Sequence, residues 1–181
     1  MKKYVSCFAT VFLFWAFIGT VNASLIGDTV TLSHNGPTLE SVAYADTVVI
    51  SSGDDDVVTL GSFSVNFDEN SFSVNFNTKD YFSTFMFNGL VVNDLHDVNN
   101  EDYYLLNVEV KTDVAGWDDS RIIFGDDFAA FNWSGLSFNT DSEFTAMLEF
   151  GPNPIPIPTT MILFATGLIG LAMVRRKKTE N

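Results

Sequence analysis

Two nearly adjacent copies of one five-residue pattern constrain the fold of this chain more than any other feature. Residues 63–67 and 72–76 both read Phe-Ser-Val-Asn-Phe, and Asp-Glu-Asn-Ser joins them. Because successive side chains of a β-strand point to opposite faces, each copy puts two phenylalanines and a valine on one face. Serine and asparagine take the other face. The pattern predicts a β-hairpin with a four-residue loop, whose aromatic face is one wall of a core.

Further strands are predicted at short spacing along the chain. Apolar or β-branched runs, separated by turn residues, lie at 28–32, 47–50, 57–60, 82–87, 90–92, 105–110, 121–124, 128–133, 136–138 and 144–150. Leu106, Val108 and Val110 are expected on one face of their strand, and Phe144, Ala146, Leu148 and Phe150 on one face of the last. Outside the two ends no helical periodicity occurs. The sequence therefore predicts an all-β fold, an antiparallel β-sandwich of jelly-roll-like or immunoglobulin-like type.

The beginning of the chain is typical of a secretory signal peptide. Lys2 and Lys3 precede an apolar stretch, 4–18, and Val-Asn-Ala at 21–23 supplies small residues at the positions that signal peptidase reads. We expect residues 1–23 to form a signal helix that the Sec translocon handles, with cleavage between Ala23 and Ser24.

The end of the chain predicts a membrane segment. Residues 161–174 are an unbroken apolar run, and Arg-Arg-Lys-Lys follows at 175–178. As a helix the run is about 21 Å long, short of a ~30 Å hydrocarbon core, but counting back to Ile155 gives a sufficient span. The positive-inside rule keeps the basic tail, 175–181, in the cytoplasm and puts the preceding chain across the inner membrane. A plain C-terminal transmembrane anchor is the simplest interpretation.

A proline-rich segment, 152–160, precedes that run and changes the interpretation. The tail resembles a PEP-CTERM sorting signal, which has a Val-Pro-Glu-Pro motif, a Thr-Gly-Leu-x-Gly-Leu-Ala core in the apolar stretch and an arginine cluster. The matching positions are Pro156, Ile157, Pro158, Gly167, Arg175 and Arg176, with Ile157 in place of the family's glutamate. The resemblance implies processing by an exosortase in a Gram-negative bacterium that makes exopolysaccharide. It also implies a final location in the cell envelope or outside the cell.

Residues 24–151 form the secreted part and have the length of a single domain. The only cysteine, Cys7, precedes them, so they contain no disulfide. They hold every acidic residue except Glu180 but only three basic ones, Lys79, Lys111 and Arg121, which gives about −19 against −14 for the whole chain. Such a surface repels nucleic acid and anionic lipid. The domain also resembles the mature region of some PEP-CTERM proteins of no assigned activity, at 24–31, 87–95, 118–124 and 131–138.

Catalytic motifs are sparse. His34 and His96 are expected in solvated loops, and no Gly-x-Ser-x-Gly nucleophile motif occurs. Among so many acidic residues, many carboxylate pairs could be chosen for glycoside hydrolysis, so no particular pair indicates a catalytic site. We therefore expect a non-enzymatic protein without a cofactor, and a secreted hydrolase is the second alternative.

A carbohydrate-binding or calcium-dependent adhesive module is the first alternative. Acidic clusters at 54–56, 94–102 and 118–119 put oxygen ligands in turns, as calcium requires, although charged turns facing solvent are their ordinary explanation. The best candidate ligands are Asp94, Asp97, Asn99, Glu101 and Asp102. For a glycan such as the exopolysaccharide, Trp117 in its predicted loop offers an indole face on which a sugar ring stacks. Trp133 is expected in the core.

Overall fold

The computed structural model describes residues 24–52 and 56–152. Its elements are β1 (Thr29–Asn35), β2 (Val42–Val49), β3 (Val58–Leu60), β4 (Phe63–Phe67), β5 (Ser71–Phe76), β6 (Asp80–Tyr81), β7 (Gly89–Asn93), β8 (Tyr103–Thr112), the 3-10 turn η2 (Asp119–Arg121), β9 (Ile122–Phe124), β10 (Ala129–Asn132), β11 (Ser137–Phe138) and β12 (Glu143–Pro152). The predicted signal helix, the proline segment after Pro152, the transmembrane helix and the basic tail lie outside these residues, and Pro152 itself is the last residue of β12. Within the described ranges, no helix is long and apolar enough to cross a membrane.

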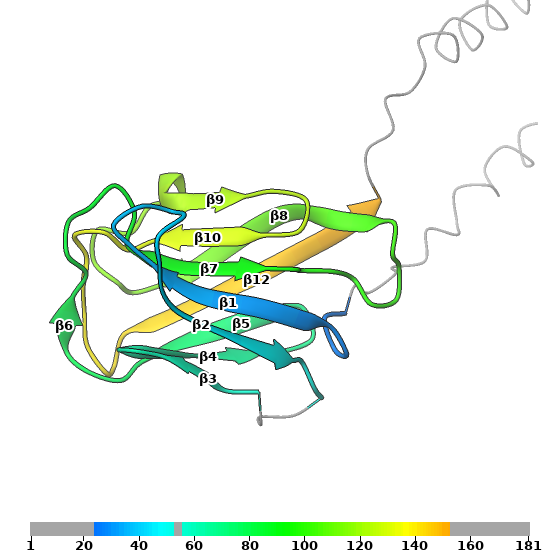
Figure 1. Ribbon diagram of the computed structural model, residues 1–181, viewed down its shortest axis with the longest axis horizontal. Helices are drawn as coiled ribbons and strands as arrows, with labels where there is room; N and C mark the ends of the chain where they lie inside the picture. The colour runs from blue at the N-terminus through cyan, green and yellow to red at the C-terminus, as the bar shows by residue number, and fades with distance from the viewer. Residues whose placement is uncertain (1–23, 53–55, 153–181) are drawn as a thin grey trace, which may run out of the picture. The chain divides into compact units, whose positions relative to one another are not determined.

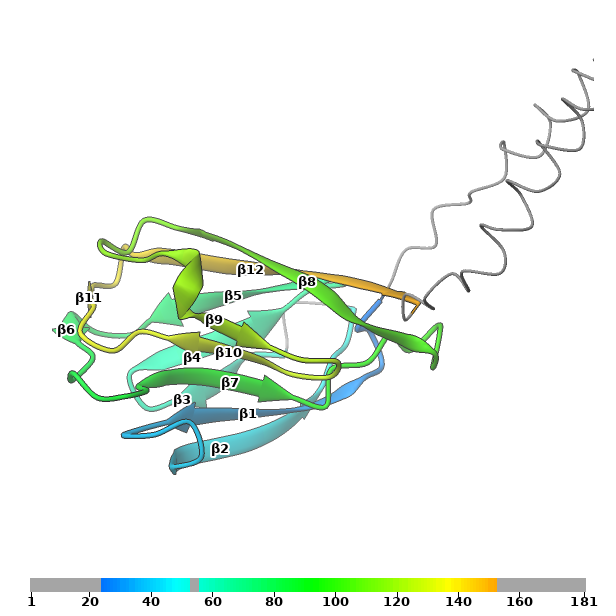
Figure 2. The ribbon, with the colours of Figure 1, turned by 90° about the horizontal axis from the view of Figure 1, so that it is seen from above.

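Two five-stranded sheets face each other (Figures 1 and 2). One has the strand order β2-β1-β7-β10-β9 and the other β3-β4-β5-β12-β8, while β6 and β11 form a small two-stranded ribbon. Every strand pair with a defined register is antiparallel. The prediction of an all-β, sandwich-like antiparallel fold is confirmed.

The predicted hairpin is present as β4 and β5. Phe63 pairs with Phe76 and Phe67 with Phe72, so the two copies of the pattern lie side by side in opposite directions. All four phenylalanines are at most 3% exposed. Removing one such side chain from water contributes about 2 kcal/mol, so the duplicated aromatic face supplies a large share of the core.

Trp133 is the centre of that core, as expected. It is 1% exposed, and its ring centroid lies 5.0 Å from those of Phe63 and Phe82 and 5.3 Å from that of Phe144. Gly89 in β7 permits the close approach of β10, because a Cβ atom there would lie 1.9 Å from the carbonyl oxygen of Phe131. Any larger residue at this position would force the two strands apart.

The strand prediction was wrong in several details. The first two strands are longer than predicted, since β1 ends at Asn35 and β2 begins at Val42. Residues 82–87 are not a strand: Phe82 and Phe87 are buried, but the backbone between them is irregular and the Ser134 hydroxyl bonds both the N–H and the carbonyl of Phe85. In β8, Leu106 is 42% exposed, whereas its neighbour Leu105 is 3% exposed. Leu105 and Val108 are thus both buried at a separation of three residues, so the strand departs from strict alternation.

Candidate functional sites

The residues of the sorting tail cannot be placed structurally. Pro156, Ile157, Pro158, Gly167, Arg175 and Arg176 lie outside the described residues, as does Ala23 on one side of the predicted cleavage site. Ser24, on the other side of that site, is the first described residue, and its position is informative.

Ser24 is folded into one end of the sandwich. It is 8% exposed, and its backbone N–H donates to Oδ1 of Asp97 at 3.1 Å. Its carbonyl accepts from the N–H of Val98 at 3.1 Å, and the N–H of Leu25 donates to the carbonyl of Glu69 at 2.7 Å. The predicted mature N-terminus is therefore fastened both to the loop after β7 and to the β4–β5 turn.

The loop 94–102 holds the five candidate calcium ligands but does not gather them. Asp97 is 1% exposed and points inward, whereas Asp94, Asn99, Glu101 and Asp102 are exposed. Besides Ser24, the Asp97 carboxylate accepts from the N–H of Asn99 at 3.0 Å and from the amide of Asn100 at 2.9 Å. Across residues 24–52 and 56–152, no three His, Cys, Asp or Glu side chains are close enough to hold a metal ion together. Calcium binding stays a prediction.

The other two acidic clusters order their own turns. The carboxylate of Asp56 accepts from the backbone N–H and the hydroxyl of Ser51, the latter at 2.9 Å, and so closes the 51–56 loop. Asp118 caps η2, where its carboxylate accepts from the hydroxyl and the N–H of Ser120. These hydrogen bonds, with a smaller contribution from the charge of Arg121, hold the pKa of Asp118 below its ordinary value. Asp54 and Asp55 lie outside the described residues.

Trp117 lies in the β8–β9 loop, as expected, but its indole is partly buried against the core. Its ring meets Phe144 edge-to-face at 4.9 Å between centroids. The indole Nε1 is buried, and no hydrogen-bond partner for it occurs in the described part of the chain. Only part of this side chain is therefore free to contact a sugar.

The two histidines have different surroundings. His96 is exposed in a loop, as expected, with Nδ1 2.8 Å from the carbonyl oxygen of Asp94. The expectation of a solvated loop was wrong for His34, which lies in β1. Its Nε2 donates to Oδ1 of Asn88 at 2.9 Å, and its ring packs at centroid distances of 5.4 Å on Phe63 and 5.8 Å on Phe82. The sequence missed this because β1 continues three residues beyond its predicted end.

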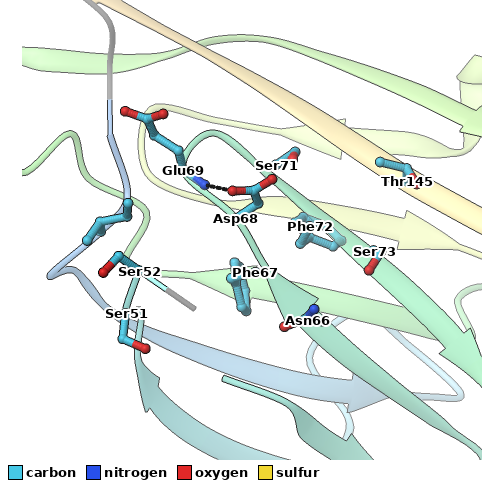
Figure 3. A pocket seen from close by; sticks show the side chains of 11 residues that line it. Ser51, Ser52, Asn66, Phe67, Asp68, Glu69, Ser71, Phe72, Ser73 and Thr145 are labelled. Carbon is cyan, nitrogen blue, oxygen red and sulfur yellow. Dashed lines mark hydrogen bonds between the residues drawn. The ribbon is translucent and has the colours of Figure 1, made fainter. Parts of the chain in front are cut away.

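A pocket of about 430 Å³ opens beside the β4–β5 turn (Figure 3). Phe67 and Phe72, both at most 3% exposed, border it together with Asn66, Asp68 and Glu69. The rest of the lining is one apolar residue, Ile26, and the hydroxyl-bearing residues Ser51, Ser52, Ser71, Ser73 and Thr145. No sequence pattern predicts this pocket, because its lining residues come from β4, β5, β12 and the loop after β2, which only the fold brings together.

Comparisons of the chain with models of protein families, with curated proteins and with solved structures find no match.

Proposed function

We propose that the protein is an exported component of the cell envelope or extracellular matrix, sorted by its C-terminal tail through an exosortase in an exopolysaccharide-producing bacterium. In this proposal a signal helix at residues 1–23 directs export, and a transmembrane helix at 161–174 holds the chain in the inner membrane until processing. The observation that carries the proposal is the order of proline motif, apolar run and arginine cluster at 156–176.

Three properties of the chain support this proposal. Its two ends agree, since a secretory signal at one end precedes a membrane segment with cytoplasmic charges at the other. The intervening domain has a continuous apolar core and no cysteine, so it needs no disulfide in an oxidising compartment. Its strongly negative charge favours solubility outside the membrane.

The decisive experiment is the intact mass of the protein recovered from the producing cells and from their medium. The proposal expects a mature chain that begins at Ser24 and ends near the proline motif, with added mass if glycan is attached. Deleting the exosortase should abolish that C-terminal processing. A mass that still contains residues 175–181 in all fractions would show that the tail is a plain anchor.

Matched variants sharpen this experiment. Pro156→Ala combined with Pro158→Ala removes the motif and should leave the tail attached. Pro154→Ala lies just upstream of the motif and should be processed normally. Equal processing of both variants would mean that the prolines are not what the enzyme recognises.

Carbohydrate binding is the second candidate, favoured by the pocket beside the β4–β5 turn. Two carboxylates, an amide and the hydroxyls of Ser52, Ser71, Ser73 and Thr145 offer the donors and acceptors that a polyol needs, while the Ser51 hydroxyl already donates to Asp56. The test is calorimetric titration with exopolysaccharide oligosaccharides from the producing strain, with and without calcium. Ser73→Val combined with Thr145→Val should abolish binding at the pocket. Trp117→Ala tests separately whether the indole contributes to glycan binding. Absence of binding by the unaltered protein would remove this candidate.

A further inference from the structure

The Asp97 carboxylate has an unusual environment for a charge. It is 1% exposed, yet its three hydrogen-bond donors are neutral: two backbone N–H groups, of Ser24 and Asn99, and the side-chain amide of Asn100. The described part of the chain places no Lys, Arg or His nitrogen within 4.0 Å of it. Burying a carboxylate is costly, and a cation beside it offsets much of that cost.

One of those three donors changes its charge if the signal peptide is removed. Hydrolysis between Ala23 and Ser24 breaks the peptide bond, adds the water oxygen to the Ala23 carboxyl and leaves Ser24 with a free α-amine. Such an amine has an ordinary pKa of about 7.7–8.0, so it takes a proton from solvent and is mostly cationic at neutral pH. The nitrogen that becomes charged is the same nitrogen that lies 3.1 Å from Oδ1 of Asp97.

We propose that Asp97 receives the mature N-terminus: the α-ammonium of Ser24 forms a buried ion pair with it, and signal-peptide removal thereby stabilises the folded domain. This inference rests on the cleavage site in the proposed function. The surrounding contacts keep the nitrogen in place, because Ser24 and Leu25 are also held through the Val98 N–H and the Glu69 carbonyl. The carboxylate already makes this hydrogen bond charge-assisted, and a cationic donor adds the attraction between two full charges, so cleavage strengthens an existing contact.

The test compares the same chain with and without the charge at Ser24. Residues 24–181 are produced in detergent with a removable N-terminal tag. A protease removes the tag so that Ser24 becomes the first residue. Half of the product is then acetylated at the Ser24 amine. The free amine should raise the unfolding midpoint by about 3–6 °C over the acetylated form, the shift expected of one strong polar contact in a domain of this size. In Asp97→Asn the difference should disappear.

Equal midpoints for free and acetylated protein would overturn the proposal, and so would a difference that persists in Asp97→Asn. If Asp97→Asn does not fold, a second measurement decides. An amine-acylating reagent at neutral pH should modify the Ser24 amine much more slowly in the folded protein than in urea, and equal rates would again overturn the ion pair. Because the tag protease creates the N-terminus, this test is independent of the cellular cleavage site, which the intact mass reports.

Discussion

The two acidic loops at opposite ends of the sandwich use similar residues in different ways (Figure 1). The loop 94–102, between β7 and β8, is bound to distant parts of the chain: Leu95 to Asp127, His96 to Asp28 and Asp97 to Ser24. The loop 113–121, between β8 and β9, is bound to distant segments at its two ends, through Asp113 with Glu143 and Arg121 with the carbonyls of Asn132 and Ser134. Between those ends its turn is held by local bonds, Val114 with Trp117 and Asp118 with Ser120. Asp97 thus joins distant segments of the chain, whereas Asp118 orders only its own turn.

The largest difference is expected at the buried aliphatic side chains. Leu95 is 1% exposed, and Leu95→Ala should lower the free energy of unfolding by about 3 kcal/mol through lost burial and the cavity left behind. Val114→Ala, in the other loop, removes fewer atoms from a more peripheral position and should cost about 1–2 kcal/mol. Urea unfolding measures both, with Val98→Ala, at an exposed residue, as the control. A cost for Val114→Ala that matches or exceeds that for Leu95→Ala would contradict the comparison.

The next largest difference in stability is expected between substitutions of Asp97 and of Asp118. Asp97→Ala leaves the buried nitrogen of Ser24 without its partner and should cost about 2–3 kcal/mol. Asp118→Ala should lower the unfolding midpoint far less, because Asp118 is exposed and water replaces most of its contacts. Circular dichroism during urea unfolding compares the variants directly. Two variants of equal stability would show that the long-range contacts of Asp97 contribute nothing.

The backbone conformations of the two loops give a smaller comparison, in which the loop 113–121 is expected to be the more sensitive to substitution. Gly116 has φ +86° and Asp94 has φ +63°, so each loop has one residue in the left-handed region. Gly116→Ala adds a Cβ atom 3.2 Å from Leu136 and should cost about 1–2 kcal/mol. Asp94→Gly removes local strain but loosens the unfolded chain, so its net effect should be below about 0.5 kcal/mol. Thermal unfolding of both variants measures the two effects. A larger loss of stability for Asp94→Gly than for Gly116→Ala would contradict the expected order.

The sequence predicted what depends on local pattern and missed what depends on distant partners. The β4–β5 hairpin and the buried face of β12 follow from alternation alone, and the structure confirms both. The irregular segment 82–87 was missed because Phe82 and Phe87 are apolar, while the Ser134 hydroxyl that satisfies its backbone lies about fifty residues away in the chain. The contact between Asp97 and Ser24 was missed for the same reason, since 73 positions separate them.

The smallest expected effect concerns the titration of Asp118. Because its pKa is held below the ordinary value in the folded state, this carboxyl favours folding above its unfolded pKa, and the contribution is lost as pH falls through the folded pKa. Ser120→Ala removes the hydroxyl donor and should move the pKa upward, toward the ordinary value. Arg121→Gln should move it less, because the hydroxyl bond is the larger cause and the guanidinium also donates to the carbonyls of Asn132 and Ser134. NMR titration of the side-chain carboxyl carbon measures both shifts. A larger shift for Arg121→Gln would mean that charge, and not the local turn, sets the acidity of this loop.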